Sequence, residues 1–106
     1  MLSLTDVADR LGIGPTGVRD LVKAGDLLVV TDAEGKSVVP GDQLDGDALV
    51  KHLQPVLRLL RDAGYRPDEA LRWLTTADPT LPGTPLQALH ENRATEIKRR
   101  AQALGF

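Results

Sequence analysis

Residues 3–25 have the sequence SLTDVADRLGIGPTGVRDLVKAG, which predicts two short helices joined by a tight turn. Ser3 followed by Asp6 is typical of a capping box, in which a hydroxyl and a carboxylate satisfy the first free N–H groups of a helix. Apolar residues then recur at helical spacing as far as Leu11. The first helix is therefore expected over residues 4–11, ended by the Gly-Ile-Gly turn that follows.

A second helix is expected to begin at Pro15, because a proline in the first helical position loses no hydrogen bond. Its buried face would carry Val18, Leu21 and Val22. Gly25 suits the left-handed conformation that commonly follows the end of a helix. Two short helices joined by a glycine turn predict a helix-turn-helix.

The segment after this helix pair predicts a β-hairpin. Residues 27–30 (LLVV) and 36–40 (KSVVP) are rich in β-formers, and the polar turn between them ends in glycine. A helix-turn-helix followed directly by a hairpin indicates a winged arrangement. Residues 41–47 (GDQLDGD) are polar and glycine-rich, so they are expected to form a linker.

The rest of the chain is expected to be helical. Apolar residues recur at helical spacing from Leu49 onward, and Pro55 is expected to kink or restart the helix there. Pro67 and Pro85 are each expected to begin a further helix. Trp73 lies in the first of these at helical spacing, which is typical of a core anchor.

The expected fold class is therefore mainly α with one small β-hairpin. A winged helix-turn-helix domain is expected over residues 1–45, and a C-terminal helical domain over residues 46–106. The 106 residues are 42% hydrophobic and 26% charged, which are ordinary values for a globular protein.

Composition excludes several classes of protein. The chain has no cysteine, which rules out disulfides, thiolate metal sites and a cysteine nucleophile. No apolar run approaches the roughly 20 residues that a membrane span needs, and the first residues lack the pattern of a secretory signal. A cytoplasmic protein with no membrane partner is expected.

No group of residues predicts catalysis or a bound cofactor. His52 and His90 each lack a second ligand at helical spacing, so no metal site is expected. Neither Ser3 nor Ser37 lies in the G-x-S-x-G pattern of a nucleophile. Residues 12–17 match G-x-G-x-x-G, but a dinucleotide site needs that pattern after a strand, and here it follows a predicted helix.

The outer face of the second helix carries the clearest functional signal. Thr16, Arg19 and Lys23 face outward if the apolar positions face the core, together with Asp20, whose carboxylate would repel phosphates. Such a surface fits the major groove of DNA, where arginine or lysine addresses guanine and threonine contacts a base or a phosphate. Lys36, in the second strand of the hairpin, would contact phosphate from the wing. The alternative interpretation is an ordinary solvated helix face.

Charge is distributed unevenly along the chain. Residues 1–50 contain four basic and nine acidic side chains, a net charge of −5, and residues 51–106 contain nine basic and six acidic ones, a net charge of +3. The densest basic run would supply phosphate contacts that the first half lacks, or it would be a solvated helix face. Its members are Arg93, Lys98, Arg99 and Arg100.

Three short motifs in the first half match a known pattern. They are Leu11-Gly12-Ile13, Gly17-Val18-Arg19 and Gly25-Asp26-Leu27. With these motifs, the first forty residues resemble the short helix-turn-helix of MerR- and excisionase-type regulators, which carry Leu-Gly-Val, Thr-Val-Arg and Gly-Glu-Leu. This chain has Gly14 where a Ser or Thr usually begins the recognition helix.

Motifs in the second half sharpen the resemblance. They are Leu60-Arg61-Asp62-Ala63-Gly64-Tyr65, Arg72-Trp73-Leu74, Leu81-Pro82-Gly83-Thr84-Pro85 and Lys98-Arg99-Arg100-Ala101. The chain looks like one actinobacterial family of small DNA-binding proteins, which have an N-terminal winged helix-turn-helix and a conserved C-terminal helical domain. The resemblance implies regulatory binding to double-stranded DNA. It assigns recognition to Thr16, Arg19 and Lys23, with Lys36 in the wing.

Two hypotheses for function remain open. The first is a DNA-binding regulator of transcription, which with so few cations would need to dimerise or to bind tandem sites. The second is a protein-interaction module, antitoxin-like or scaffolding, that acts through the C-terminal helical domain. It is motivated by the run from Trp73 to Leu89, which faintly resembles the toxin-binding domain of certain antitoxins.

Overall fold

The first two helices begin and end where their caps predict. In the computed structural model, which describes residues 1–105, α1 spans Leu4–Leu11 and α2 spans Pro15–Lys23. The Ser3 hydroxyl accepts a hydrogen bond from the backbone N–H of Asp6 at 3.0 Å, and the Asp6 carboxylate accepts one from the N–H of Ser3 at 3.3 Å. This reciprocal pair confirms the predicted capping box.

The predicted hairpin is present, but its strands are short and it gains a third strand. The strands β1 (Leu2–Ser3), β2 (Val30–Thr31) and β3 (Ser37–Val39) form an antiparallel sheet in the order β1-β3-β2. The strand β1 could not be predicted, because two residues are too few to show an alternation. We call β2, β3 and the turn between them the wing.

Residues 41–47 were predicted to form a linker, and this prediction was wrong. They form a short 3-10 helix, η1 (Gly41–Gln43), followed by the hairpin of β4 (Leu44–Asp45) and β5 (Ala48–Leu49). The side chain of Gln43 is fully buried and makes two hydrogen bonds to the backbone of Leu28, 2.8 Å to its N–H and 2.9 Å to its carbonyl. The Gln43 amide can be buried because both of its polar groups have hydrogen-bond partners, which buried polar groups need.

The second half contains four helices separated by short breaks. The helical prediction from Leu49 onward was wrong at its start, since Leu49 ends a strand and the first helix begins only at Leu53. Pro55 lies in the first turn of that helix, where proline is tolerated, so of the two predicted outcomes the helix starts here and is not kinked. The helices are α3 (Leu53–Asp62), α4 (Pro67–Thr75), α5 (Pro85–His90) and α6 (Ala94–Ala103).

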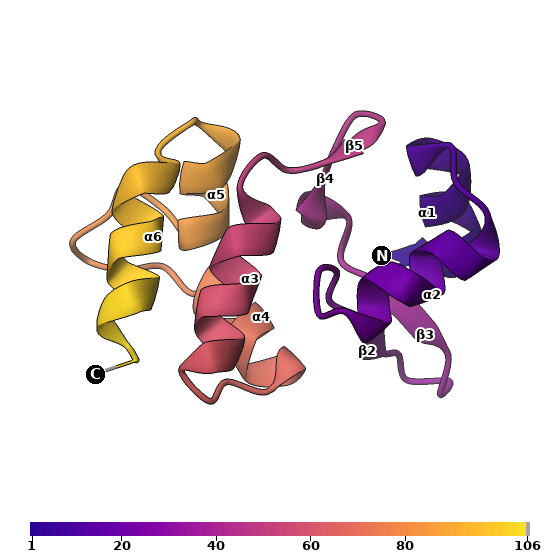
Figure 1. The fold of residues 1–106 in the computed structure, drawn as a ribbon, viewed down its shortest axis with the longest axis horizontal. Helices are drawn as coiled ribbons and strands as arrows, with labels where there is room; N and C mark the ends of the chain where they lie inside the picture. Colours follow the sequence, from indigo (N-terminus) through magenta and orange to yellow (C-terminus); the bar gives the residue numbers. More distant parts are fainter. Residues whose placement is uncertain (106) are drawn as a thin grey trace.

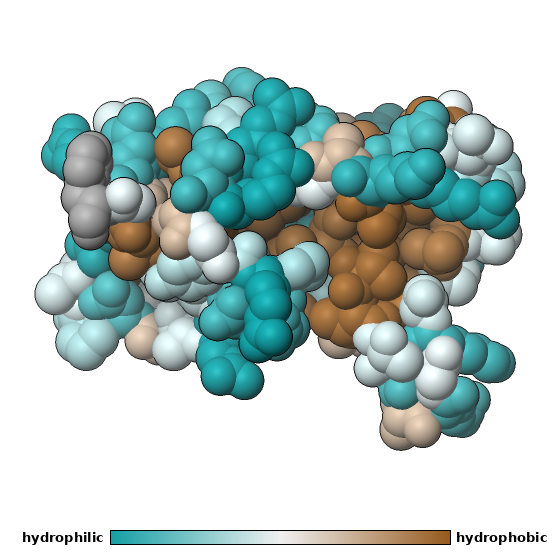
Figure 2. All heavy atoms as spheres, turned by 60° about the horizontal axis from the view of Figure 1, so that its bottom comes forward, coloured by the Kyte–Doolittle hydropathy of each residue, from teal (hydrophilic) through white to brown (hydrophobic). Residues whose placement is uncertain are grey.

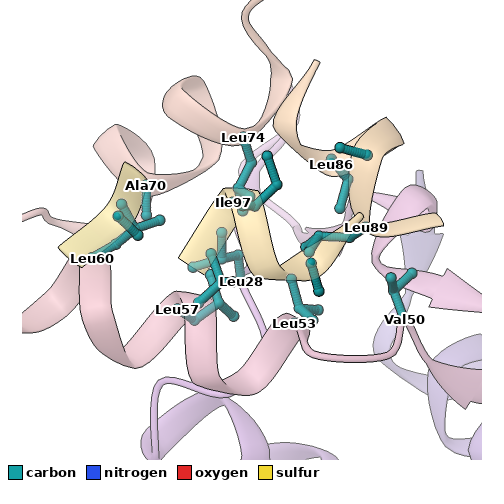
Figure 3. Close-up of a cluster of buried hydrophobic side chains, with 14 of the residues drawn as sticks. Leu28, Val50, Leu53, Leu57, Leu60, Ala70, Leu74, Leu86, Leu89 and Ile97 are labelled. Carbon is teal, nitrogen blue, oxygen red and sulfur yellow. The ribbon is translucent and has the colours of Figure 1, made fainter. Parts of the chain in front are cut away.

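Buried apolar side chains form two clusters, one in each half. The N-terminal core consists of Val7, Ala8, Val18, Leu27, Val39 and Leu44. The larger C-terminal core is built on side chains from α3 to α6, many of which Figure 3 shows converging. Leu28 comes from the N-terminal half but belongs to the C-terminal core. Adjacent leucines, Leu27 and Leu28, therefore bind the two halves of the molecule together.

Polar contacts reinforce this junction. The guanidinium of Arg58 on α3 pairs with the buried carboxylate of Asp26, with both N–O distances at 3.3 Å. Arg61 donates to the carbonyl of Ala24 at 2.6 Å, directly after the end of α2. Figure 1 shows α3 lying between α2 at one end of the molecule and α6 at the other. The position of α2 is thus fixed by the helical half.

Trp73 was predicted to anchor the core of the helical half, and it packs against that core without being buried in it. Its side chain is only half-buried and packs against the edge of the C-terminal core. The centre of that core is filled by leucines such as Leu60 and Leu74, which are fully buried. Within residues 1–105, no helix is long and apolar enough to cross a membrane.

Candidate nucleic-acid interface

The outer face of α2 carries the side chains that helical spacing predicted. Val18 points into the N-terminal core and is 1% exposed, whereas Thr16, Arg19 and Lys23 are exposed to solvent. Among residues 1–105, no carboxylate forms an ion pair with Arg19 or Lys23. Both cations are therefore available to an external anion.

These cations share a hollow with the wing. A cavity of about 180 Å³ between α2 and β3 is lined by Arg19 and Lys23 on one side and by Ser37 on the other. Its floor is apolar and includes Val22 and Val29. Figure 2 shows a hydrophobic area on the half of the molecule that carries α2 and the wing. The arrangement places two cations at the rim of an apolar groove.

The turn of the wing is shaped by its own acid. One carboxylate oxygen of Asp32 accepts hydrogen bonds from the N–H groups of Glu34 and Lys36, both at 2.9 Å, and Gly35 adopts a left-handed conformation with φ of 81°. The Lys36 ammonium lies 3.9 Å from the Glu34 carboxylate, and both side chains are more than 70% exposed. Ion pairs between exposed side chains are weak, so the Lys36 ammonium can leave Glu34 for another anion.

The N-terminus of α2 is open. Gly14 precedes the helix and provides no side-chain hydrogen bond to its first N–H groups. At Gly17, in the first turn, an added Cβ would lie 3.2 Å from the Cδ1 atom of Ile13, so the exposed Ile13 side chain would have to shift slightly. The Ile13 side chain therefore covers the position that a residue other than glycine would occupy.

The four C-terminal cations lie around α6, at the opposite end of the molecule from α2 (Figure 1). Arg100 donates to Asp78 at 3.1 Å and to Glu96 at 2.7 Å, and Arg93 pairs with Glu91. The remaining two differ from these, since Lys98 contacts His52 at 3.0 Å and Arg99 is exposed. The structure does not bring this group to the face formed by α2 and the wing.

The acid that Arg100 contacts is held in its charged form. The backbone N–H and the hydroxyl of Thr80 both donate to the Asp78 carboxylate, at 2.8 and 2.7 Å. These bonds lower the pKa of Asp78 below its ordinary value, and the charge of Arg100 lowers it further. Arg100 is thus part of an internal network.

The two histidines are far from forming a metal site. His52 precedes α3 in a left-handed conformation, and the His90 ring nitrogen Nε2 lies 2.6 Å from the carbonyl oxygen of Asp42. Within residues 1–105, no group of three or more histidine, aspartate or glutamate side chains is placed to hold a metal ion.

The residues of α3 that contact the end of α2 could not be predicted from the sequence. Arg58 and Arg61 approach the end of α2 from α3, and their contacts with Asp26 and Ala24 span 32 and 37 residues of the chain. No local motif marks such long-range contacts. The one sequence signal is the apolar periodicity of α3, which places both arginines away from the face that packs into the C-terminal core.

The fold and this site define a winged helix-turn-helix domain joined to a helical domain. Residues 1–44 match the family described as "DNA-binding protein Rv2175c, wHTH domain", and residues 50–105 match "Rv2175c C-terminal domain of unknown function". The chain belongs to the Rv2175c family. The predicted fold class and the predicted membership of an actinobacterial family of DNA-binding proteins are both confirmed.

Two relatives support this assignment. DNA-binding protein Rv2175c of Mycobacterium tuberculosis is 35% identical over 115 aligned positions, which cover 97% of this chain and 79% of the relative. The NMR structure of Rv2175c superposes with a TM-score of 0.89 at 35% identity, covering 99% of this chain and 80% of that one. The likeness to MerR-type regulators stays a prediction.

Proposed function

We propose that this protein binds double-stranded DNA through the outer face of α2 and the wing, and that it acts as a regulator of transcription. The observation that carries the proposal is the hollow lined by Arg19, Lys23 and Ser37. There two cations of α2, which form no ion pair among residues 1–105, lie beside the wing. The relative from Mycobacterium tuberculosis is named a DNA-binding protein, which supports the same function here.

In the proposed complex α2 enters the major groove. Arg19 addresses the O6 and N7 atoms of a guanine, and Thr16 contacts a base or a phosphate. Lys23 and Lys36 neutralise phosphates on either side of the groove. The open N-terminus of α2 adds backbone N–H groups of the kind that commonly bind phosphate.

The division of labour follows the predicted domains. Residues 1–45 would contact DNA, and residues 46–106 would hold α2 in place through Arg58 and Arg61. The predicted boundary falls within the β4–β5 hairpin, so the halves share that element. We leave the cations of α6 out of the interface, because Arg93 and Arg100 hold carboxylates of their own half.

A single module of this size has few phosphate contacts. Three cations at the interface predict a weak salt dependence and modest affinity. Regulation at a defined operator would therefore require two copies on adjacent half-sites. The proposal places the protein in the cytoplasm, where a bacterial chromosome is found.

The test is a duplex-binding titration of the full chain at about 50 and about 200 mM salt, with a duplex selected from a random-sequence pool. Arg19→Ala should weaken binding to the selected duplex by about 1–3 kcal/mol if Arg19 reads a base. An equal loss on all duplexes would assign Arg19 to a phosphate.

Arg99→Ala is the matched control, because Arg99 is an exposed cation on α6. It should change affinity by less than about twofold, which is within the usual range for a residue outside an interface. Loss of binding in Arg99→Ala with full binding in Arg19→Ala would overturn the proposed site. Mapping of chromosomal binding sites tests the regulatory role, which requires enrichment at promoters.

A further inference from the structure

A hollow in the helical half lies between α4 and the segment that leads to α5. It has a volume of about 440 Å³, within the common range of about 300–1,000 Å³ for ligand sites. Trp73 and Tyr65 line it, together with Pro79 and Pro85. The chain has three aromatic residues in all, and this hollow gathers two of them. We call it the Trp73 hollow.

The polar atoms of both aromatic side chains are without protein partners. Among residues 1–105, neither the indole N–H of Trp73 nor the hydroxyl of Tyr65 makes a hydrogen bond, and neither is left buried without a partner. Both groups therefore reach solvent. Arg72, on the same wall, is exposed and forms no ion pair in this part of the chain. The hollow thus offers several hydrogen-bond donors beside two aromatic rings.

The two carboxylates that line the hollow already accept hydrogen bonds from the chain. Asp78 accepts hydrogen bonds from Thr80 and Arg100, and Glu69 accepts them from the backbone N–H and the side chain of Arg66. An incoming ligand would therefore meet free donors and flat apolar surfaces.

Proline-rich peptide has the complementary chemistry. A proline has no backbone N–H to satisfy, its carbonyl oxygen accepts hydrogen bonds, and its ring stacks on aromatic side chains. The extended polyproline II helix is also preformed, so it loses little conformational entropy on binding. We propose that the Trp73 hollow binds a proline-rich segment of a partner protein in the polyproline II conformation.

Nucleic acid fits this hollow less well. The carboxylates of Glu69 and Asp78 lie on its wall, and Arg72 is the one lining cation without an ion pair among residues 1–105, so the wall attracts phosphates only weakly. The Trp73 hollow is also formed by residues of the helical half alone, whereas the proposed DNA interface is formed by α2 and the wing. The inference therefore goes beyond DNA binding, and each of the two can fail without the other.

The single tryptophan of the chain makes a direct test possible. In nuclear magnetic resonance spectra of the ¹⁵N-labelled full chain, Trp73 gives the only indole N–H signal. An oligoproline peptide of about ten residues should shift that signal in a saturable way. A Gly-Ser peptide of the same length should leave it in place. An unmoved indole signal at saturating oligoproline, or an equal response to both peptides, would overturn the proposal.

Two variants separate hydrogen bonding from mere contact. Trp73→Phe keeps an aromatic ring and removes the indole N–H. Tyr65→Phe removes only the hydroxyl, so it provides the test if Trp73→Phe does not fold. Each should weaken peptide binding, followed by backbone signals of α4, by roughly three- to tenfold. Arg19→Ala should leave it unchanged. Full affinity in Tyr65→Phe and Trp73→Phe, or an indole signal that moves with protein concentration alone, would contradict the proposal.

Discussion

The net charge of each half does not show which of its cations are unpaired. The first half is acidic overall, yet Arg19 and Lys23 on α2 have no acidic partner among residues 1–105. The second half is basic overall, and there Arg66, Arg93 and Arg100 pair with carboxylates of the same half, whereas Arg72 and Arg99 form no ion pair among residues 1–105. Net charge alone points to the second half, whereas the proposed interface lies in the first. The accessible, unpaired cation is the better guide to a nucleic-acid surface.

The cores differ in a related way. The C-terminal core is the larger and takes Leu28 from the other half, whereas the N-terminal core is small. Arg58 and Arg61 then tie the end of α2 to α3. The helical half therefore supports the position of α2 as well as its own fold.

The largest expected effect concerns the shared core. Leu28→Ala should lower the free energy of unfolding by about 2–5 kcal/mol, because it opens a cavity in the C-terminal core. Leu27→Ala is the matched change in the N-terminal core. Urea unfolding followed by Trp73 fluorescence and by circular dichroism should show one coincident transition in both variants. Two separated transitions would mean that the halves unfold independently.

A second prediction contrasts the two kinds of cation. Arg100→Ala should lower the free energy of unfolding by about 1–2 kcal/mol, because its side chain is 29% exposed and bonds to two carboxylates. Arg19→Ala should change stability by less than about 0.5 kcal/mol. Thermal unfolding of both variants measures this difference. The contrast would be lost if Arg19→Ala proved the more destabilising change.

A third prediction compares the capping boxes of the two halves. Ser3 caps α1 and Thr84 caps α5, each by accepting a backbone N–H bond, at 3.0 and 3.1 Å. Ser3→Ala and Thr84→Ala should each lower the free energy of unfolding by about 1 kcal/mol. Denaturant titration of the two variants checks this. A cost near zero in one of them would show that its helix is held by packing alone.

The smallest expected effect is on proton binding in the helical half. Because the pKa of Asp78 is lowered in the folded state, its ionised form adds stability above the ordinary value of 3.8, and this stability is lost as pH falls through the lowered value. Thr80→Ala removes one of the hydrogen bonds and should raise the pKa of Asp78. Carboxyl ¹³C titration measures it. Thr76→Ala is the control, because the Thr76 hydroxyl donates to a carbonyl of α4 and not to Asp78. It should leave the pKa of Asp78 unchanged. The same pKa of Asp78 in the wild type and in Thr80→Ala would refute the role of Thr80.

Elements with local signals could be predicted from the sequence. The caps at Ser3 and Thr84 and the prolines at positions 15 and 67 mark helix starts within a few residues, and the structure has helices there. The β4–β5 hairpin could not be predicted, because strands of two residues show no alternation, and neither could the contact of the buried Gln43 amide with Leu28, which spans 15 residues of chain. Periodicity also could not tell which core Leu28 would enter.

The candidate site divides in the same way. Exposure of Thr16, Arg19 and Lys23 follows from the helical period once Val18 is buried, so that face could be predicted. The pairing of Arg100 with Asp78 could not, since 22 residues and a loop separate them. The solvent exposure of the Trp73 indole N–H likewise depends on the packing of α4 beside α5, which the spacing of residues along the chain does not predict.

The central claim is that the α2 face and the wing lie against double-stranded DNA. It is tested most directly by adding a short duplex to the ¹⁵N-labelled protein at low ionic strength and following backbone amide signals. The account predicts shifts at Thr16, Arg19, Lys23 and Lys36, with the amide of Arg99 unmoved. Unchanged signals along α2, or shifts confined to α6, would contradict it.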